Sequence, residues 1–90
     1  MATTARVPLQ TYLDAAMRHA QLQWLPDDKM WLADLTIPEL QGASSAQPTQ
    51  EWALRELREV VKDLIAWIVE DGEPLPDIDG MALDRTTVAA

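Results

Sequence analysis

The feature that most constrains this fold is a two-residue period of apolar and polar side chains over residues 20–35. In its middle, Pro26-Asp27-Asp28-Lys29 supplies the residue types of a tight turn. A loop of those residues pairs Trp24 with Trp31 across two antiparallel strands. The pairing puts one set of side chains on a common face, namely Ala20, Leu22, Trp24, Trp31, Ala33 and Leu35. Because a slip of one residue would move this set to the other face, the pattern predicts a hairpin in this register, with the tryptophans as a core pair.

A helix is predicted on each side of the hairpin. Apolar residues spaced three and four apart predict the first helix over 9–19. A longer helix is predicted over 50–71, because Thr49 can cap its start and Gly72 can end it. Between the hairpin and the long helix, the small residues of 43–47 predict a short edge strand.

These elements predict one α+β domain with the order α-β-β-β-α, in which a small antiparallel sheet is packed by the long helix. Ninety residues give enough chain for a single core and too little for two. The domain is expected over 9–80, after a flexible N-terminus at 1–8 and before a C-terminal tail at 81–90 that either adds a short strand or hangs free. The chain has no cysteine and no apolar run near the roughly 20 residues that a bilayer requires, which fits a cytoplasmic protein.

Acidic residues outnumber basic ones by fifteen to seven, and the formal net charge is −8. This sign opposes binding to a phosphate backbone, so nucleic acid is not expected as a direct ligand. Residues 51–90 hold ten acidic and four basic side chains (−6), against five and three (−2) in residues 1–50. The run from Glu70 to Asp84 holds six acids and neither lysine nor arginine. It is either a solvated tail or a surface complementary to a basic partner.

The long helix carries more apolar surface than one neighbour can bury. Its apolar positions cover an arc of roughly 200°, which is wider than a single core-facing stripe. Trp52 stands outside that arc, among charged residues. Trp52 and Trp67 therefore either pack within the monomer or form the surface of a homo-oligomer (dimer or tetramer) or of a partner complex.

No arrangement of residues indicates catalysis. His19 is the single histidine, and it is expected to act as a helix-end cation without a base partner. Ser44 and Ser45 lie outside any Gly-x-Ser-x-Gly elbow, and three scattered glycines exclude a phosphate-cradling loop. The acids that could chelate a cation fail the spacing of a calcium loop; they are Asp71, Glu73, Asp77 and Asp79. We therefore expect a protein without enzymatic activity, with no catalytic residue, cofactor or metal.

Four short motifs follow one another along the chain. They are Trp31-Leu32-Ala33-Asp34-Leu35, Pro38-Glu39-Leu40-Gln41-Gly42, the helix start from Thr49 to Leu57 with Ala53-Leu54, and Glu70-Asp71-Gly72-Glu73-Pro74-Leu75-Pro76. In this order they resemble the HicB-like antitoxin family, over roughly Tyr12 to Asp79. The chain departs from the family pattern at the inserted Thr36 and Ile37, at Gln47 in place of a common glycine, and at Trp52 in place of an acid.

The resemblance implies a sheet packed by one long helix, related to a degenerate ribonuclease-H-like half. It implies a noncatalytic protein that neutralises a small basic mRNA-cleaving toxin by covering its surface. The candidate contact residues are Glu39 and Gln41 on the rim of the sheet and Glu70, Asp71 and Glu73 beside the helix end. Larger family members append a DNA-binding module, and the fourteen residues after Pro76 favour a compact member without it.

Two other functions stay open. An orphan structural homo-oligomer would use the apolar helix surface for self-assembly alone and would have no toxin partner. A metal-dependent nuclease or other hydrolase would use clustered carboxylates, an interpretation that rests on the fold analogy only.

Overall fold

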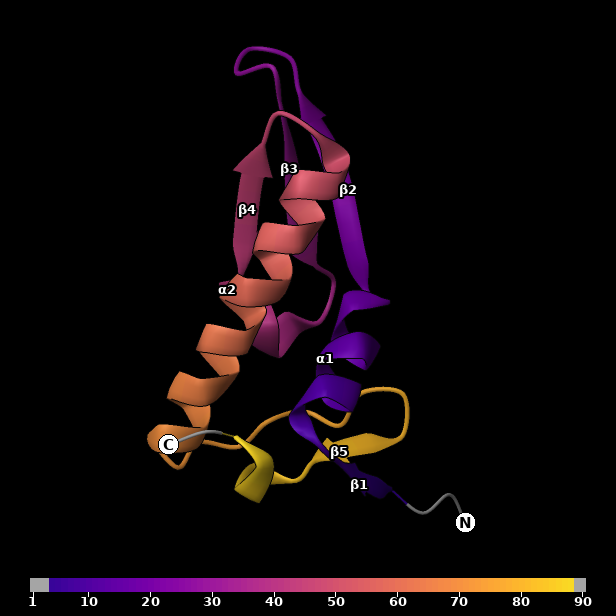
Figure 1. Ribbon diagram of the computed structural model, residues 1–90, viewed down its shortest axis with the longest axis vertical. Helices are drawn as coiled ribbons and strands as arrows, with labels where there is room; N and C mark the ends of the chain where they lie inside the picture. The colour runs from indigo at the N-terminus through magenta and orange to yellow at the C-terminus, as the bar shows by residue number, and fades with distance from the viewer. Residues whose placement is uncertain (1–3, 89–90) are drawn as a thin grey trace.

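The computed structural model describes residues 4–88 as two helices and five short strands around one core (Figure 1). In chain order the elements are β1 (Ala5–Val7), α1 (Leu9–Met17), β2 (Ala20–Leu25), β3 (Met30–Leu35), β4 (Ser44–Gln47), α2 (Gln50–Glu70) and β5 (Met81–Leu83). Turns of 3-10 helix follow β3 at Pro38–Leu40 (η1) and β5 at Arg85–Thr87 (η2). The predicted α+β fold class is confirmed, since an antiparallel three-stranded sheet packs against the long helix.

The hairpin has the predicted register. β2 and β3 pair antiparallel with Leu25 opposite Met30 and Trp24 opposite Trp31. The two indole centroids are 5.3 Å apart, and the ring planes are tilted by 55°. Trp24 is nevertheless 44% exposed, so the prediction that both tryptophans are core residues is wrong for it. The reason is that the end of the hairpin projects beyond the start of α2, the helix that covers the sheet (Figure 1).

α2 packs across one face of the sheet. β4 pairs antiparallel with β3 as the predicted edge strand, which gives the strand order β2-β3-β4. Side chains spaced four residues apart on α2 are fully buried, namely Ala53, Leu57, Val61 and Ile65. They share one core with Tyr12 and Leu13 of α1 and with Leu35 of β3. No helix within residues 4–88 is long and apolar enough to cross a bilayer.

Both ends of α2 follow the sequence prediction. Thr49 Oγ1 accepts a hydrogen bond from the Trp52 backbone N–H at 3.1 Å, as an N-cap does. At the other end Gly72 adopts φ 71°, a left-handed conformation that costs glycine little. The Gly72 and Glu73 N–H groups then donate to the carbonyls of Val69 and Ile68, which closes the last turn.

The two ends of the described chain pair with each other, which differs from the expected flexible N-terminus at 1–8. β1 pairs in parallel with β5, with Val7 opposite Leu83. The Leu9 N–H also donates to Thr87 Oγ1 at 2.9 Å, which ties η2 to the start of α1. β5 is the short strand that the sequence allowed in 81–90. Residues 1–3 and 89–90 of these segments lie outside the described residues.

Candidate protein-binding surface

The acidic run after α2 forms a surface at the C-terminal end of that helix. Glu70 ends the helix, Asp71 is its C-cap, and Glu73 follows Gly72. All three acidic side chains are exposed, and none forms an ion pair with another residue of 4–88. The last turn of α2 holds no basic residue. Since the C-terminal end of a helix carries partial negative charge, these carboxylates lie in an unfavourable field.

Trp67 lies one turn before these carboxylates and is 64% exposed. Residues three and four apart share a helix face, so Glu70 and Asp71 lie on the same face as Trp67. An exposed aromatic ring beside carboxylates is complementary to arginine, which can stack on the ring and pair with the acids. Trp52 is 45% exposed and lies in the first turn of α2, at the opposite end of the helix. The two tryptophans therefore lie at opposite ends of α2.

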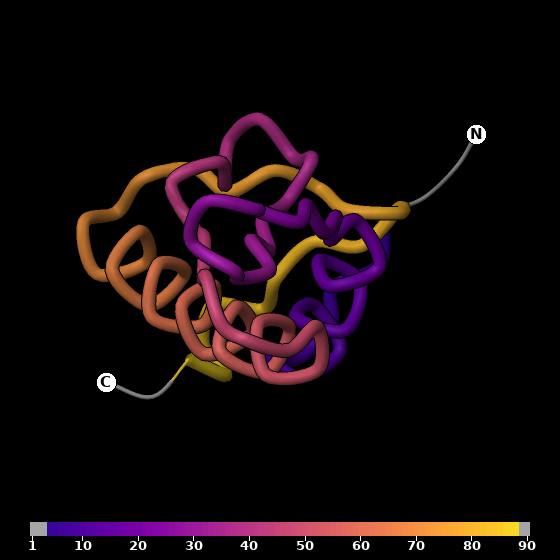
Figure 2. The backbone as a smooth tube through the Cα atoms, turned by 90° about the horizontal axis from the view of Figure 1, so that it is seen from above, coloured from indigo at the N-terminus to yellow at the C-terminus, as the bar shows by residue number. Residues whose placement is uncertain are grey.

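The segment that carries the acidic run is tied to the rest of the fold. After α2 the segment passes alongside α1 before it enters β5 (Figures 1 and 2). Tyr12 Oη of α1 donates to the Pro76 carbonyl at 2.5 Å, and the Arg85 guanidinium donates to the Glu73 carbonyl. Burial raises the pKa of Tyr12 to about 12, and the charges of Asp77 and Glu39 act in the same direction. The acidic run is thus held against the fold and does not hang free as a tail, while its acidic side chains stay exposed to solvent.

A cleft of about 300 Å³ opens between this segment and the connection from β3 to β4. Residues 36–39 line one side, residues 76–79 line the other, and His19 closes one end. The inserted Thr36 and Ile37 lie in this cleft and outside the strand ladder, because β3 and β4 pair without a bulge. The candidate contact residue Glu39 belongs to the cleft wall, whereas Gln41 lies beyond η1 and is exposed outside it.

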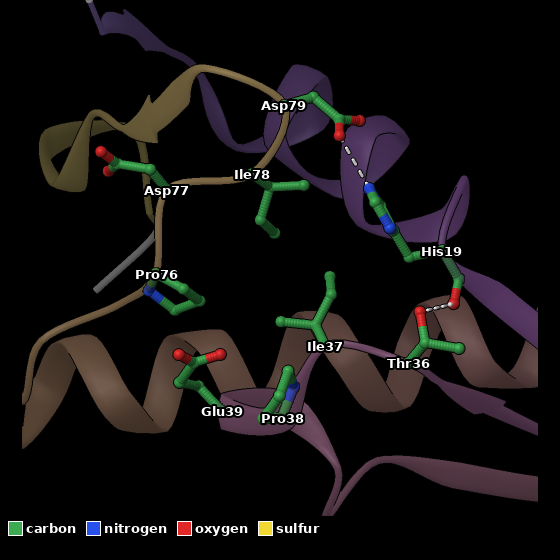
Figure 3. Close-up of a pocket in the computed structure, with 9 residues that line it drawn as sticks. All are labelled: His19, Thr36, Ile37, Pro38, Glu39, Pro76, Asp77, Ile78 and Asp79. Carbon is green, nitrogen blue, oxygen red and sulfur yellow. Dashed lines mark hydrogen bonds and ion pairs between the residues drawn. The ribbon is translucent and has the colours of Figure 1, made fainter.

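His19 has an acidic partner that was not evident from the sequence. Asp79 Oδ1 lies 2.8 Å from His19 Nε2, and Asp79 Oδ2 lies 3.4 Å from Arg18 Nε (Figure 3). The hydrogen bond with His19, followed by that from Arg18, holds the pKa of Asp79 below its usual range. Thr36 carries the hydroxyl group that lines the cleft, and it donates to the His19 carbonyl at 3.1 Å. The pair ties α1 to the turn before β5, and no local pattern indicated it because 60 positions separate the partners.

Metal ligation finds no support in this arrangement. Among residues 4–88, no group of three or more histidine, aspartate or glutamate side chains could hold a metal ion. Asp79, which was one of the acids considered for chelation, is already paired with Arg18 and His19. Ser44 and Ser45 lie in β4 and do not line the cleft with His19.

Comparison with known proteins places this fold in a family. The family model described as UPF0150-like matches residues 11–76, which is most of the chain. The chain belongs to the UPF0150-like family. The UPF0150-like match begins in α1 and ends at Pro76, so it includes the three-stranded sheet and α2 and leaves β1 and β5 outside.

The crystal structure of TTHA0281 from Thermus thermophilus is similar to this UPF0150-like chain. The TM-score is 0.68 with 22% sequence identity, over 79% of this chain and 92% of that chain. At this identity the similarity shows the fold alone. No curated protein matches the sequence.

Proposed function

We propose that this UPF0150-like protein is a noncatalytic binding module that neutralises a small basic mRNA-cleaving toxin by covering its surface. The resemblance to HicB-like antitoxins suggests the class of partner. The observation that carries the proposal is the uncompensated charge at the C-terminal end of α2, where Glu70 and Asp71 share a helix face with the exposed Trp67 and Glu73 follows.

An isolated monomer gains no stability from this arrangement. Acids at a helix C-terminus oppose the helix dipole, and an exposed indole leaves apolar surface in water. A basic partner would relieve both, because lysine and arginine pair with carboxylates and arginine stacks on an indole face. Concentrated negative charge on one face also steers a basic protein toward it and speeds association at low salt.

The experiment that tests this proposal begins with capture of the partner on the tagged chain from a lysate of the host at low salt. We expect a small basic protein near a one-to-one ratio, which raised salt releases because the contact is electrostatic. That protein, expressed alone, should arrest growth and cleave mRNA. Co-expression with the present chain should restore growth and suppress the cleavage.

Charge reversal provides the matched comparison. The variant E70K/D71K/E73K should lose the partner and the rescue of growth. The variant D28K/E56K/E59K changes net charge equally at exposed acids that form no ion pair within residues 4–88, and it should keep both. Unchanged affinity of the helix-end variant at low salt would refute the contact surface. A captured protein that does not arrest growth would refute the proposal that the partner is a toxin.

A second candidate function, an orphan homo-oligomeric structural protein, is favoured by the exposed tryptophans at the hairpin end of the fold. Trp24 is 44% exposed at the end of β2, and Trp52 is 45% exposed in the first turn of α2. Sedimentation equilibrium separates the candidates. A defined oligomer that W24S and W52S variants convert to monomer, with no basic protein captured, would favour self-assembly.

A further inference from the structure

The cleft between residues 36–39 and 76–79 has apolar walls. Figure 3 shows Ile37 and Ile78 facing each other across the space, with the rings of Pro38 and Pro76 on its margin. Ile78 belongs to the core and is only 3% exposed, so packing fixes its position, whereas Ile37 is half-buried. At about 300 Å³ the cleft lies at the lower limit of pockets that bind small molecules. This size suits a single long side chain.

The charge of the cleft is negative after its internal ion pairs are taken into account. Asp79 is compensated by Arg18 and hydrogen-bonded to His19. Glu39 and Asp77 form no ion pair within residues 4–88, and Asp77 accepts a hydrogen bond only from the neutral Thr4 hydroxyl, at 3.3 Å. In Figure 3 Glu39 and Pro76 both lie at the margin of the space, and the Asp77 carboxylate points away from it. The rim of the cleft therefore carries the carboxylates of Glu39 and Asp77, neither of which pairs with a cation within residues 4–88.

We propose that this cleft receives an arginine side chain of the basic protein partner, an assignment that rests on the proposed function for the nature of that partner. The hydrocarbon stem would lie between Ile37 and Ile78, and the guanidinium would pair with Glu39 at the mouth, in the field of Asp77. Arginine fits better than lysine because its guanidinium is more weakly hydrated and its flat face packs against proline rings. The partner would thus contact two places, the cleft and the C-terminal end of α2.

A methyl NMR titration of the full chain with blocked arginine, N-acetyl-arginine-N-methylamide, tests the cleft without the partner. The chain has four isoleucines, of which Ile37 and Ile78 line the cleft and Ile65 and Ile68 lie in α2. We expect saturable shifts of the Ile37 and Ile78 methyl signals and none at Ile65. Blocked citrulline, which has the same shape without the charge, should bind about fivefold more weakly, since one exposed ion pair contributes up to about 1 kcal/mol.

The variant E39Q should weaken the binding of blocked arginine about fivefold, whereas E56Q, a matched change at an exposed acid on α2, should leave it unchanged. With the captured partner, E39Q should lower affinity by a similar factor and E56Q should not. Absent cleft shifts, equal binding of citrulline, or an E39Q complex of unchanged affinity would overturn the assignment. Those results would leave the proposed function standing, provided that the helix-end variant still loses the partner. Failure to capture any basic partner would instead refute the proposed function, and with it an arginine from that source.

Discussion

Neutralising the carboxylates at the C-terminal end of α2 should make the isolated protein more stable. The variant E70Q/D71N/E73Q keeps the size and shape of the three side chains and removes their charges. Two of them lie at the last residue and the C-cap of the helix, where the dipole field is strongest. The third lies just beyond, and no described residue forms an ion pair with any of them.

The expected gain follows from the strength of the interaction between charge and helix dipole. A charge of the favourable sign at a helix end contributes about 0.3–1 kcal/mol when it is exposed, and an acid at the C-terminus has the unfavourable sign. The effect declines within one turn, so Glu70 and Asp71 should dominate and the total should be about 1 kcal/mol. For a domain of this size, about 1 kcal/mol raises the melting temperature by about 4–8 °C.

Urea denaturation at neutral pH and low salt measures this gain, with the variant D28N/E56Q/E59Q as control. Both variants change the net charge from −8 to −5, because each removes three negative charges. Only E70Q/D71N/E73Q should gain stability beyond about 0.5 kcal/mol. The difference in stability between the two variants should shrink in about 1 M salt, because screening removes the interaction with the helix dipole. Equal stabilisation by both variants would refute the reasoning, because net charge alone would then explain it. A variant that is more stable and yet loses the partner would show that these acids serve binding.

Other predictions test the core, the helix cap and the ties of the acidic segment. Tyr12 is the single tyrosine, so its absorbance titration should give a folded-state pKa of about 12. An unfolded tyrosine has a pKa of about 10, so the stability that Tyr12 contributes is complete below about pH 10 and is lost as the pH rises through about 12. Urea denaturation at a series of pH values should show this loss. Leu57→Ala should cost about 2–5 kcal/mol in urea denaturation, because Leu57 is fully buried, whereas Leu57→Met should cost less than about 1.5. Thr49→Ala should cost about 1 kcal/mol by loss of the cap, and Thr49→Ser should restore most of it. The pKa of Asp79 is lowered in the folded state, so the stability that Asp79 contributes is present above its unfolded-state pKa of about 3.9. That stability is lost as the pH falls through the lower folded-state pKa. Asp79→Asn should therefore flatten the acid part of the plot of unfolding free energy against pH.

Periodicity explains which parts of the fold were predictable. The register of β2 and β3 followed from a two-residue alternation, because only one register puts Ala33 and Leu35 on the core face. α2 followed from its length and its two end signals, Thr49 and Gly72. β1 escaped prediction because a strand of three residues has no measurable period, and its pairing with β5 joins residues more than 70 positions apart.

The candidate site shows the same division between local and distant information. The acids at Glu70, Asp71 and Glu73 were recognisable as a run, since charge can be counted along the chain. The cleft was not recognisable, because Ile37 and Ile78 are separated in the sequence by β4 and α2 and come together only in the folded chain. The partner of His19 was missed for the same reason.

Whether the acidic run acts as a binding surface depends on how it is held. Tyr12 Oη bonds the Pro76 carbonyl, His19 pairs with Asp79, and Arg85 bonds the Glu73 carbonyl, so contacts from α1 and η2 fix the segment along its length. All of these contacts leave the carboxylates of Glu70, Asp71 and Glu73 free. A segment that is already ordered loses less conformational entropy when a partner binds than a mobile tail would lose. Tyr12→Phe removes the hydrogen bond to Pro76 and loosens the segment, so it should weaken partner affinity. Tyr12 is fully buried and cannot touch the partner itself. If the acidic run acted as a disordered tail, the Tyr12→Phe variant would bind the partner as well as the unmodified chain does.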